Sequence, residues 1–406
     1  MNEILSEYNQ LCKDFNQYEH TVIPLCAAEN YVSKFCMTPL ISNFEGKYSF
    51  TEASGNNSFI GGEYIERLND LLRRQCKITF GANYVNTETL TGINCFTVCV
   101  MSLLSSEDYV LVTTPEQGGH ASIPIILDTI GVKYDSVPYD YLNYQINYKK
   151  LNNLCQSHKY SFIIFCQSDV INPPDLKLIN IPDEMGIIYD CTQTLGLIAA
   201  GIVQNPLEFS NNLILIGGSH KTLPAPSCGL IMTNNELYKE KLKKHITPDY
   251  LRNTQPNHSA ALLLALIEQQ ECGHNYQKLI VETANILGKE LSDLGFKVAK
   301  PNSELFTFTH QLFILMNEEE TENFYITAKQ YNITLNKKHK KLFNNDGIRI
   351  GTQQIARYNW SNPEIKLLAQ LFKSIREQKH NEILKIRELL ISKKIPHFTY
   401  EDMSIK

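Results

Sequence analysis

Four short apolar runs, separated by amphipathic segments, constrain the fold of this chain more than any other feature. They occupy residues 109–113, 161–166, 186–190 and 213–216. They are rich in β-branched and aromatic residues, as is typical of strands buried on both faces. Strands that alternate with helical segments predict an α/β fold with a mostly parallel central sheet. A fifth run, residues 229–233, follows a Pro-rich turn and is expected to pair with the fourth as a hairpin.

The hydrophobic period becomes helical between residues 257 and 292, and we expect this segment to link two lobes. Beyond it lie strand-like runs at 311–316 and 347–351, then helical patterns at 363–377 and 380–392. These elements predict a small C-terminal α+β domain. The expected division is an N-terminal arm (1–20), a large domain (21–275) and a small domain (276–406).

Composition narrows the possible partners. A net charge of −5 and a pI near 6.1, with Lys and Arg spread along the chain, argue against a nucleic-acid partner. The N-terminal residues lack a basic stretch followed by an apolar one, and no apolar run approaches about 18 residues. We therefore expect a cytoplasmic protein without a membrane span. The 11 cysteines form no CxxC pair, which favours reduced thiols over a zinc or disulfide role.

A lysine and an aspartate at the ends of two predicted strands carry the first chemical signal. Lys221 lies in a polar turn just after the strand at 213–216, and Asp190 ends the strand before it. Ligands of parallel sheets bind at these carboxyl ends. A partly desolvated lysine can form an imine with an aldehyde cofactor, and a buried carboxylate can keep the ring nitrogen of pyridoxal phosphate protonated. A surface lysine and a helix N-cap are the plain alternatives for the two residues.

Several short motifs follow one another in the order found in one enzyme family. They are Leu25-Cys-Ala-Ala-Glu-Asn-Tyr, Gly61-Gly-Glu-Tyr-Ile-Glu, Gly118-Gly-His, Asp190 with Gly196-Leu-Ile-Ala-Ala-Gly201, Ser219-His-Lys-Thr-Leu, and Gly347-Ile-Arg-Ile-Gly-Thr. With these motifs the chain resembles the serine hydroxymethyltransferase family from about residue 20 to 375. The resemblance implies pyridoxal-phosphate fold type I, with a large cofactor-binding domain and a small C-terminal domain.

The resemblance also implies roles for individual residues. Lys221 would hold pyridoxal phosphate as a Schiff base, Asp190 would pair with the pyridine nitrogen, and His120 would stack on the ring. The turn Thr91-Gly92 would bind the phosphate, and Ser168 and His220 would line the cofactor. Arg349 would grip the substrate carboxylate, and Glu52 would carry a proton near the substrate hydroxyl. A loop histidine, a surface salt bridge and an exposed loop carboxylate are the plain alternatives for His120, Arg349 and Glu52.

The departures from the family concentrate where folate would bind. Phe59 and Ile60 replace two tyrosines, Pro115 and Ala121 replace leucines that clamp the pterin, and Lys338 replaces an asparagine in a shortened loop. In the substrate pocket, Ala28, Gln193 and Ser227 replace a serine, a histidine and an arginine. The folate site is therefore expected to be damaged while the cofactor site is intact.

These observations predict a pyridoxal-phosphate-dependent transferase or lyase acting on a small α-amino acid. The leading expectation is folate-independent chemistry at the Cα–Cβ bond, as in a threonine aldolase or a transaldolase with an aldehyde co-substrate. A tetrahydrofolate-dependent hydroxymethyltransferase, an aminotransferase or decarboxylase, and a non-catalytic relative remain alternatives. The resemblance further implies a homodimer, with the segment that begins at Asn253 reaching the partner's cofactor phosphate.

Overall fold

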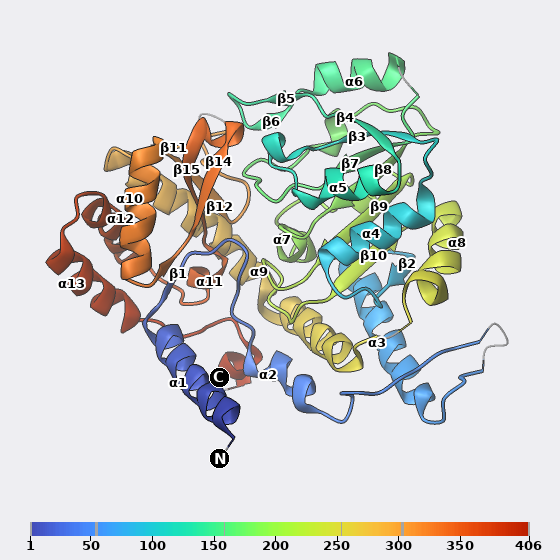
Figure 1. Ribbon diagram of the computed structural model, residues 1–406, viewed down its shortest axis with the longest axis horizontal. Coiled ribbons are helices and arrows are strands. Elements are labelled where there is room, and N and C mark those ends of the chain that lie inside the picture. The colour runs from blue at the N-terminus through green and yellow to red at the C-terminus, as the bar shows by residue number, and fades with distance from the viewer. Residues whose placement is uncertain (1, 53–55, 158, 253, 302–303, 405–406) are drawn as a thin grey trace. The chain divides into compact units, whose positions relative to one another are not determined.

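The structure, a computed structural model, describes residues 2–52, 56–157, 159–252, 254–301 and 304–404 (Figure 1). The chain divides into two compact units: Ala28–Lys278 with Phe398–Lys406, and Met1–Ala27 with Leu279–His397. The main boundary falls within the long helix α9 (Pro256–Asp293). The observed division differs from the expected one. Residues 21–27, like the expected arm 1–20, belong to the smaller unit, whereas residues 276–278 and the last helix, α14 (Tyr400–Ser404), belong to the larger one.

Pairing and stacking explain the differences near the two ends of the chain. β1 (Ile23–Pro24) pairs in parallel with β13 (Ile333–Thr334), which ties the N-terminal segment to the smaller unit. At the other end of the chain, the ring of Tyr400 stacks on Phe35 at 4.4 Å between centroids. Contacts between residues hundreds of positions apart leave no mark in the local pattern.

The larger unit is built on a seven-stranded sheet. Its order is β2 (Tyr84–Asn86), β10 (Gly229–Thr233), β9 (Leu213–Gly218), β8 (Gly186–Asp190), β7 (Phe162–Phe165), β3 (Tyr109–Val112) and β4 (Lys133–Ser136). The five strands from β9 to β4 pair in parallel, whereas β10 runs antiparallel to both of its neighbours. The mostly parallel sheet and the β9–β10 hairpin are therefore confirmed.

Side chains of this sheet fill a core on each face. Leu111, Ile163, Ile187 and Leu215 face one core, whereas Val110, Ile164, Ile188 and Ile214 face the other. The first core also receives residues of α3 (Gly62–Phe80), α6 (Tyr148–Ser157), α7 (Leu195–Ala199) and α9. The second receives residues of α4 (Gly92–Leu103), α5 (Ser122–Thr129) and α8 (Glu236–His245). Burial on both faces explains why these strands read as continuous apolar runs.

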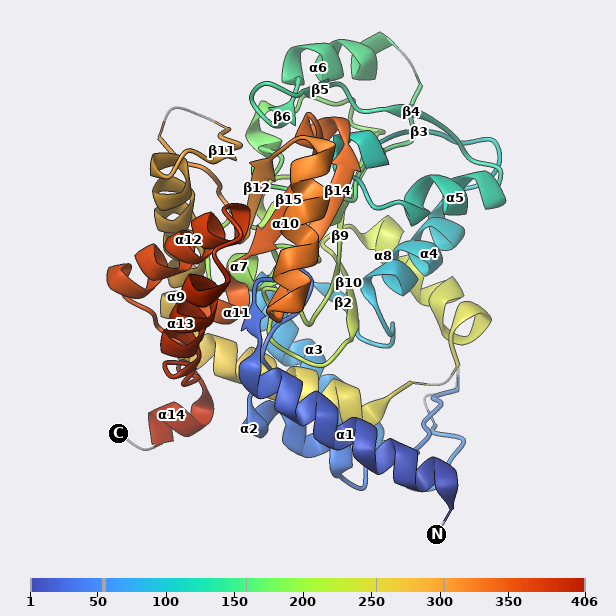
Figure 2. The ribbon, with the colours of Figure 1, turned by 60° about the vertical axis from the view of Figure 1, so that its left-hand side comes forward.

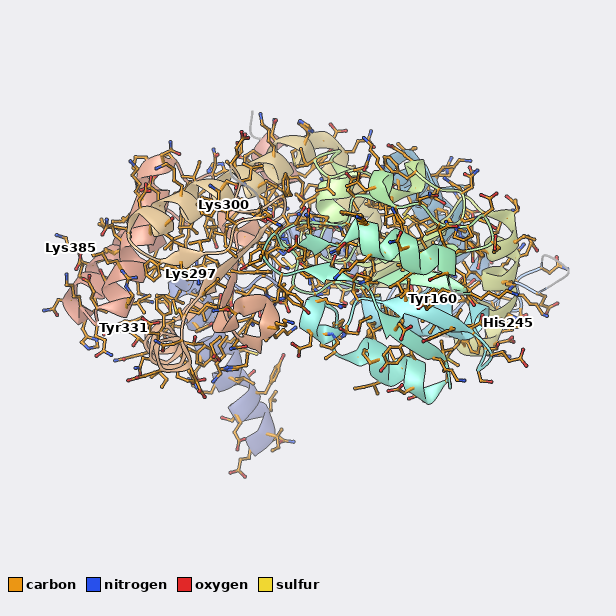
Figure 3. The ribbon with its side chains drawn as sticks, turned by 90° about the horizontal axis from the view of Figure 1, so that it is seen from above. Tyr160, His245, Lys297, Lys300, Tyr331 and Lys385 are labelled. Atoms are coloured by element: carbon orange, nitrogen blue, oxygen red, sulfur yellow. The ribbon has the colours of Figure 1, made fainter. Side chains whose placement is uncertain are left out.

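The smaller unit holds a four-stranded antiparallel sheet in the order β11 (Lys297–Val298), β12 (Gln311–Leu315), β15 (Asn345–Gly351) and β14 (Asn336–Lys340). Figure 2 shows α10 (Glu318–Gln330) in front of these strands. With α12 (Asn362–Arg376) and α13 (His380–Ile391), α10 forms one core against Ile348 and Ile350. Tyr331, labelled in Figure 3, ends α10 and hydrogen-bonds His380 of α13 at 2.7 Å. The expected α+β lobe is present.

The two units also include five further elements. In the larger unit these are α2 (Lys34–Met37), β5 (Tyr139–Asp140) and β6 (Gln145–Ile146), and in the smaller unit α1 (Glu3–Thr21) and α11 (Gln353–Ala356). Within the described ranges, no helix combines the length and the apolar character that crossing a bilayer requires.

Candidate active site

The predicted cofactor residues follow the carboxyl ends of four neighbouring parallel strands. His120 follows β3, Ser168 follows β7, Asp190 ends β8, and Lys221 lies just beyond β9. Parallel strands bring these ends to a single edge of the sheet. The structure thus brings together residues spread over about a hundred positions of sequence.

Asp190 is the electrostatic centre of this edge. Its Oδ1 accepts a hydrogen bond from the backbone N–H of Thr192 at 2.8 Å, so it does cap a local turn. Burial raises the pKa of the Asp190 carboxyl, and hydrogen bonds from Thr192 and the charges of Lys221 and His120 oppose that shift. A buried carboxylate that has lost its hydration is stabilised by a cationic partner, such as a protonated pyridine nitrogen.

The backbone around Lys221 is held from several directions. Asn30 donates from Nδ2 to the carbonyl of Lys221 and, at 2.9 Å, to the hydroxyl of Tyr276 in α9. The next residue, Thr222, donates from Oγ1 to the carbonyl of Gln193 at 2.9 Å, and its own carbonyl accepts from Gln277 Nε2 at 2.7 Å. These hydrogen bonds fix the backbone position from which the Lys221 side chain extends, and a lysine that forms an imine needs such a fixed position.

His220 precedes the lysine in an unusual conformation. Its φ is 81°, in the left-handed region that residues other than glycine rarely adopt. Burial, together with the neighbouring charge of Lys221, lowers the pKa of His220 to about 4. The ring is therefore neutral at physiological pH. Its Nδ1 is buried and has no hydrogen-bond partner within the part of the chain that the structure describes.

The turn Thr91-Gly92 opens helix α4 at the same edge of the sheet. Thr91 caps the helix, accepting a hydrogen bond from the N–H of Asn94 at 3.2 Å. A Cβ on Gly92 would lie 2.6 Å from Thr192 Oγ1 and 3.3 Å from the backbone nitrogen of Gly218. Only glycine fits this close approach to the end of β9, and the N-terminus of a 12-residue helix suits a phosphate.

Two hydrogen bonds hold His120 beside the end of β7. Its N–H donates to the carbonyl of Cys166 at 2.8 Å, and its Nδ1 accepts from the N–H of Ser122 at 3.2 Å. In the neutral ring the proton is therefore on Nε2. Ser168 joins the same loop, because its N–H donates to the carbonyl of Gly118 at 2.7 Å. The imidazole itself remains exposed, as a ring that stacks on a cofactor must be.

Glu52 is not brought to this cluster within the chain. It is exposed and accepts a hydrogen bond from Ser58 Oγ at 2.7 Å. It lines a separate pocket of about 1080 Å³, together with Arg73, Arg74 and Arg252. The same pocket is lined by residues of α3 and β2, and the residues of the Lys221 cluster are not among those that line it.

Arg349 lies in β15 of the smaller unit, and its side chain is only 6% exposed. It is in register with Phe313 of β12 and with Asn336 of β14. Its Nη2 donates to Asn336 Oδ1 at 2.9 Å. A guanidinium presented in a largely buried setting is a strong binder of carboxylates.

Sequence reasoning missed the residues that hold others in place. Asn30, Tyr276 and Gln277 fix the lysine turn, and Thr192 also joins it, accepting from the N–H of Gly218 at 2.9 Å. Asn30 belongs to a motif that pointed to the family but carried no sign of this contact. The predicted residues fit pyridoxal phosphate: an amine, a carboxylate, an exposed imidazole and a helix N-terminus all meet at one sheet edge. Asn253 lies outside the described residues.

Comparison with known proteins identifies the family of this chain. Residues 2–372 match the family model described as serine hydroxymethyltransferase. The serine hydroxymethyltransferase of Methanothermobacter marburgensis is 27% identical over 97% of this chain and 95% of its own length, and that of Methanobrevibacter smithii is 28% identical over 98% and 96%. The crystal structure of the L-threonine transaldolase from Pseudomonas fluorescens has the same fold, with a TM-score of 0.89, 19% identity, and coverage of 99% of this chain and 96% of that one. The chain belongs to the serine hydroxymethyltransferase family and is a pyridoxal-phosphate-dependent enzyme that acts on a small amino acid.

Proposed function

We propose that this enzyme is a folate-independent aldolase or transaldolase that passes a glycyl unit from a β-hydroxy-α-amino acid to an aldehyde. The observation that carries the proposal is the contrast between the two sites. The lysine, carboxylate and imidazole of the cofactor site are retained, whereas residues expected to contact folate are replaced. The likeness to a threonine transaldolase supports the same reading.

The side chains at the pterin positions support the loss of folate binding. Ile60 is fully exposed and Phe59 is 45% exposed, and neither carries a hydroxyl group. Pro115 and Ala121 offer a smaller apolar surface than leucine. A pterin has several polar groups to match, and each one buried without a partner costs about 1 to 3 kcal/mol. Two or three such losses would weaken binding by several orders of magnitude.

The chemistry divides between the cofactor and the chain. When bound, pyridoxal phosphate supplies an electron sink for the pair left on Cα. Lys221 would hold it covalently, Asp190 would keep its ring nitrogen protonated, and Thr91 and Gly92 would bind its phosphate. Arg349 would orient the substrate through its carboxylate, and His120 would limit the movement of the ring. These roles rest on the geometry above and on the family resemblance.

The proposed transfer balances as an aldol exchange. The donor's β-hydroxyl group loses its proton, and the electron pair of its O–H bond forms the second bond of the carbonyl group in the departing aldehyde. The electron pair of the broken Cα–Cβ bond stays on Cα. That pair then attacks the carbonyl carbon of the acceptor aldehyde. The acceptor's oxygen takes up a proton and becomes the new β-hydroxyl group.

The test measures cleavage of serine and threonine with and without tetrahydrofolate, and threonine turnover with added aldehydes. We expect threonine to release acetaldehyde without folate, and added aldehydes to yield new β-hydroxy amino acids. Calorimetric titration with 5-formyltetrahydrofolate in the presence of glycine should give no micromolar binding. Serine turnover that requires folate would instead identify a serine hydroxymethyltransferase, the activity for which its relatives are named. An α-keto acid or carbon dioxide as product would instead identify an aminotransferase or a decarboxylase.

We further propose a homodimer in which Glu52 acts in the partner's active site. The separate pocket that Glu52 lines supports this arrangement. Helix α1 supports it as well, because Ile4, Tyr8, Leu11 and Phe15 recur on one face and are 57% to 70% exposed. A second copy would cover this apolar face. Localisation in the cytoplasm stays a prediction, to be tested by fractionation.

Subunit mixing tests the shared site. Lys221→Ala and Glu52→Gln variants are each expected to be inactive. After their subunits are exchanged, one site in each mixed dimer keeps both residues, so about a quarter of wild-type activity should return. No recovery in mixtures shown to contain mixed dimers would place Glu52 with its own chain, and an active Glu52→Gln variant would place it outside catalysis.

A further inference from the structure

Strand β14 carries cationic side chains on both of its faces, and the two faces have different neighbours. The strand reads Asn-Lys-Lys-His-Lys over Asn336–Lys340 and forms the edge of the small sheet. Asn336 pairs with Arg349 and Lys338 with Gly347 of β15. Alternate residues of a strand share a face, so Lys338 and Lys340 lie on the face that carries Asn336 and Arg349. We call this set of three cations, Arg349, Lys338 and Lys340, the cationic face.

Two ion pairs lie on the opposite face of β14. Lys337 pairs with Glu322 of α10 at 2.6 Å and lies 5.1 Å from the ring of Tyr325. His339 pairs with Asp346 at 2.6 Å. Lys337 and His339 are the more exposed residues of the strand, whereas Lys338 and Lys340 are half-buried. Lys337 is therefore a neighbouring cation on the opposite face of the same strand, and it provides a matched control.

The surroundings of the cationic face favour anions. Phe313 lies opposite Arg349 in the register, and its ring packs against Phe343 at 4.5 Å. Both aromatic rings are buried. An apolar floor lowers the local dielectric constant, so the charge of the guanidinium and of lysines beside it acts more strongly than at an open surface.

The spacing along β14 suits a ligand with two anionic ends. Alternate residues of a strand lie about 6.6 Å apart, so Lys338 stands one such step from Asn336 and Lys340 stands two. If Arg349 takes the amino acid's carboxylate, a second anionic group a few bonds away falls within reach of the flexible lysine side chains. Lysine is suited to this role because it binds carboxylates and phosphates of varied geometry as a point charge.

We propose that the acceptor aldehyde carries an anionic group, a carboxylate or a phosphate, which Lys338 and Lys340 bind while Arg349 holds the amino acid. This inference rests on the proposed aldol function and names its substrate class. The product is then a β-hydroxy-α-amino acid with an anionic side chain. Lys338 stands where the family has an uncharged asparagine, and this replacement is consistent with a change of ligand from a pterin to an anion.

Matched aldehydes test the proposal with threonine as donor. Succinic semialdehyde and butyraldehyde have similar lengths but end in a carboxylate and a methyl group, and glycolaldehyde phosphate separates phosphate from carboxylate. We expect the anionic member to be preferred by about 10- to 100-fold in kcat/KM. The Lys338→Ala/Lys340→Ala variant should reduce that ratio to about one. The matched control is Lys337→Ala, which removes the same charge from the opposite face and should keep the preference.

A binding measurement separates this inference from the proposed function. Succinate and inorganic phosphate are titrated by calorimetry into the holoenzyme saturated with glycine, so that Arg349 is already engaged. Wild type and Lys337→Ala should bind at least one of the two anions, and the double variant should bind it about tenfold or more weakly. If no aldehyde turns over but this difference remains, the aldol function fails and the anion site stands. Equal binding by all three proteins, or turnover without preference for anionic aldehydes, would overturn the inference. The lysines would then serve to keep the edge strand β14 from pairing with strands of other chains.

Discussion

Removing the Arg349 side chain provides a direct test of substrate binding. The guanidinium is 6% exposed and stands beside an apolar ring, so its contact with a carboxylate is poorly screened. Loss of a charge-assisted, two-bond contact costs about 2 to 3 kcal/mol, which corresponds to about 30- to 150-fold weaker binding. Arg349→Ala also deprives Asn336 of the donor that now reaches its Oδ1 at 2.9 Å. The loss of that bond affects the free and the bound protein alike, so the expected loss of amino-acid affinity stays about 30- to 150-fold.

Two further variants refine the same prediction. Arg349→Lys keeps the charge but not the planar fork, so we expect binding about 5- to 30-fold weaker than wild type. Asn336→Ala keeps the guanidinium but removes one orienting bond of about 0.5 to 1.5 kcal/mol, so about a two- to tenfold loss is expected. Lys385→Ala, an exposed residue of α13, serves as the control for charge removal.

The assay follows the cofactor's absorbance while glycine or threonine is titrated into each holoenzyme. Circular dichroism and thermal melting establish that each variant is folded and retains cofactor. Equal affinity of wild type and Arg349→Ala for both amino acids would refute the reasoning, because no carboxylate contact would then pass through this residue. A similar loss in Lys385→Ala would also refute it, since the effect would then reflect net charge.

Three other predictions concern the cofactor edge. Lys221→Ala should abolish the borohydride-stable adduct seen by mass spectrometry, and a reduced cofactor found on another lysine would contradict the assignment. Burial raises the pKa of Asp190, so the folded cofactor-free protein binds the proton of this carboxyl more tightly than the unfolded chain does. The ionised carboxylate therefore lowers the free energy of unfolding, and this loss grows as pH rises through the acidic range. Asp190→Asn should therefore raise the melting temperature of the cofactor-free protein at neutral pH while abolishing activity, and a lower melting temperature there would contradict the desolvation argument. Because His220 has a lowered pKa of about 4, its neutral form stabilises the fold above the unfolded value near 6.5, and that stability is lost as pH falls from about 6.5 to 4. His220→Gln should flatten this loss in denaturant titrations, and an unchanged slope would assign it to other groups.

Local pattern was sufficient for much of this fold. The runs at 109–113, 161–166, 186–190 and 213–216 became β3, β7, β8 and β9, because strands buried on both faces need apolar side chains at every position. The order of motifs led to the serine hydroxymethyltransferase family, to fold type I and to pyridoxal phosphate, and the comparisons confirm these predictions. Roles of single residues, including Lys221 and Arg349, stay predictions.

Tertiary structure decided what depends on contacts between distant segments. The bond from Asn30 to the Lys221 turn spans 191 positions, and the pairing of β1 with β13 moved residues 21–27 into the smaller unit. Glu52 was predicted from the family resemblance, yet it lines a pocket with residues of α3 and β2 rather than with those of the edge that holds Lys221. The sequence by itself determined which segments form strands and which residue types are available for chemistry, because burial period and side-chain identity are local properties. Only the fold decided which residues meet and which face of β14 each lysine occupies, because strand register and long-range packing are set by the whole chain.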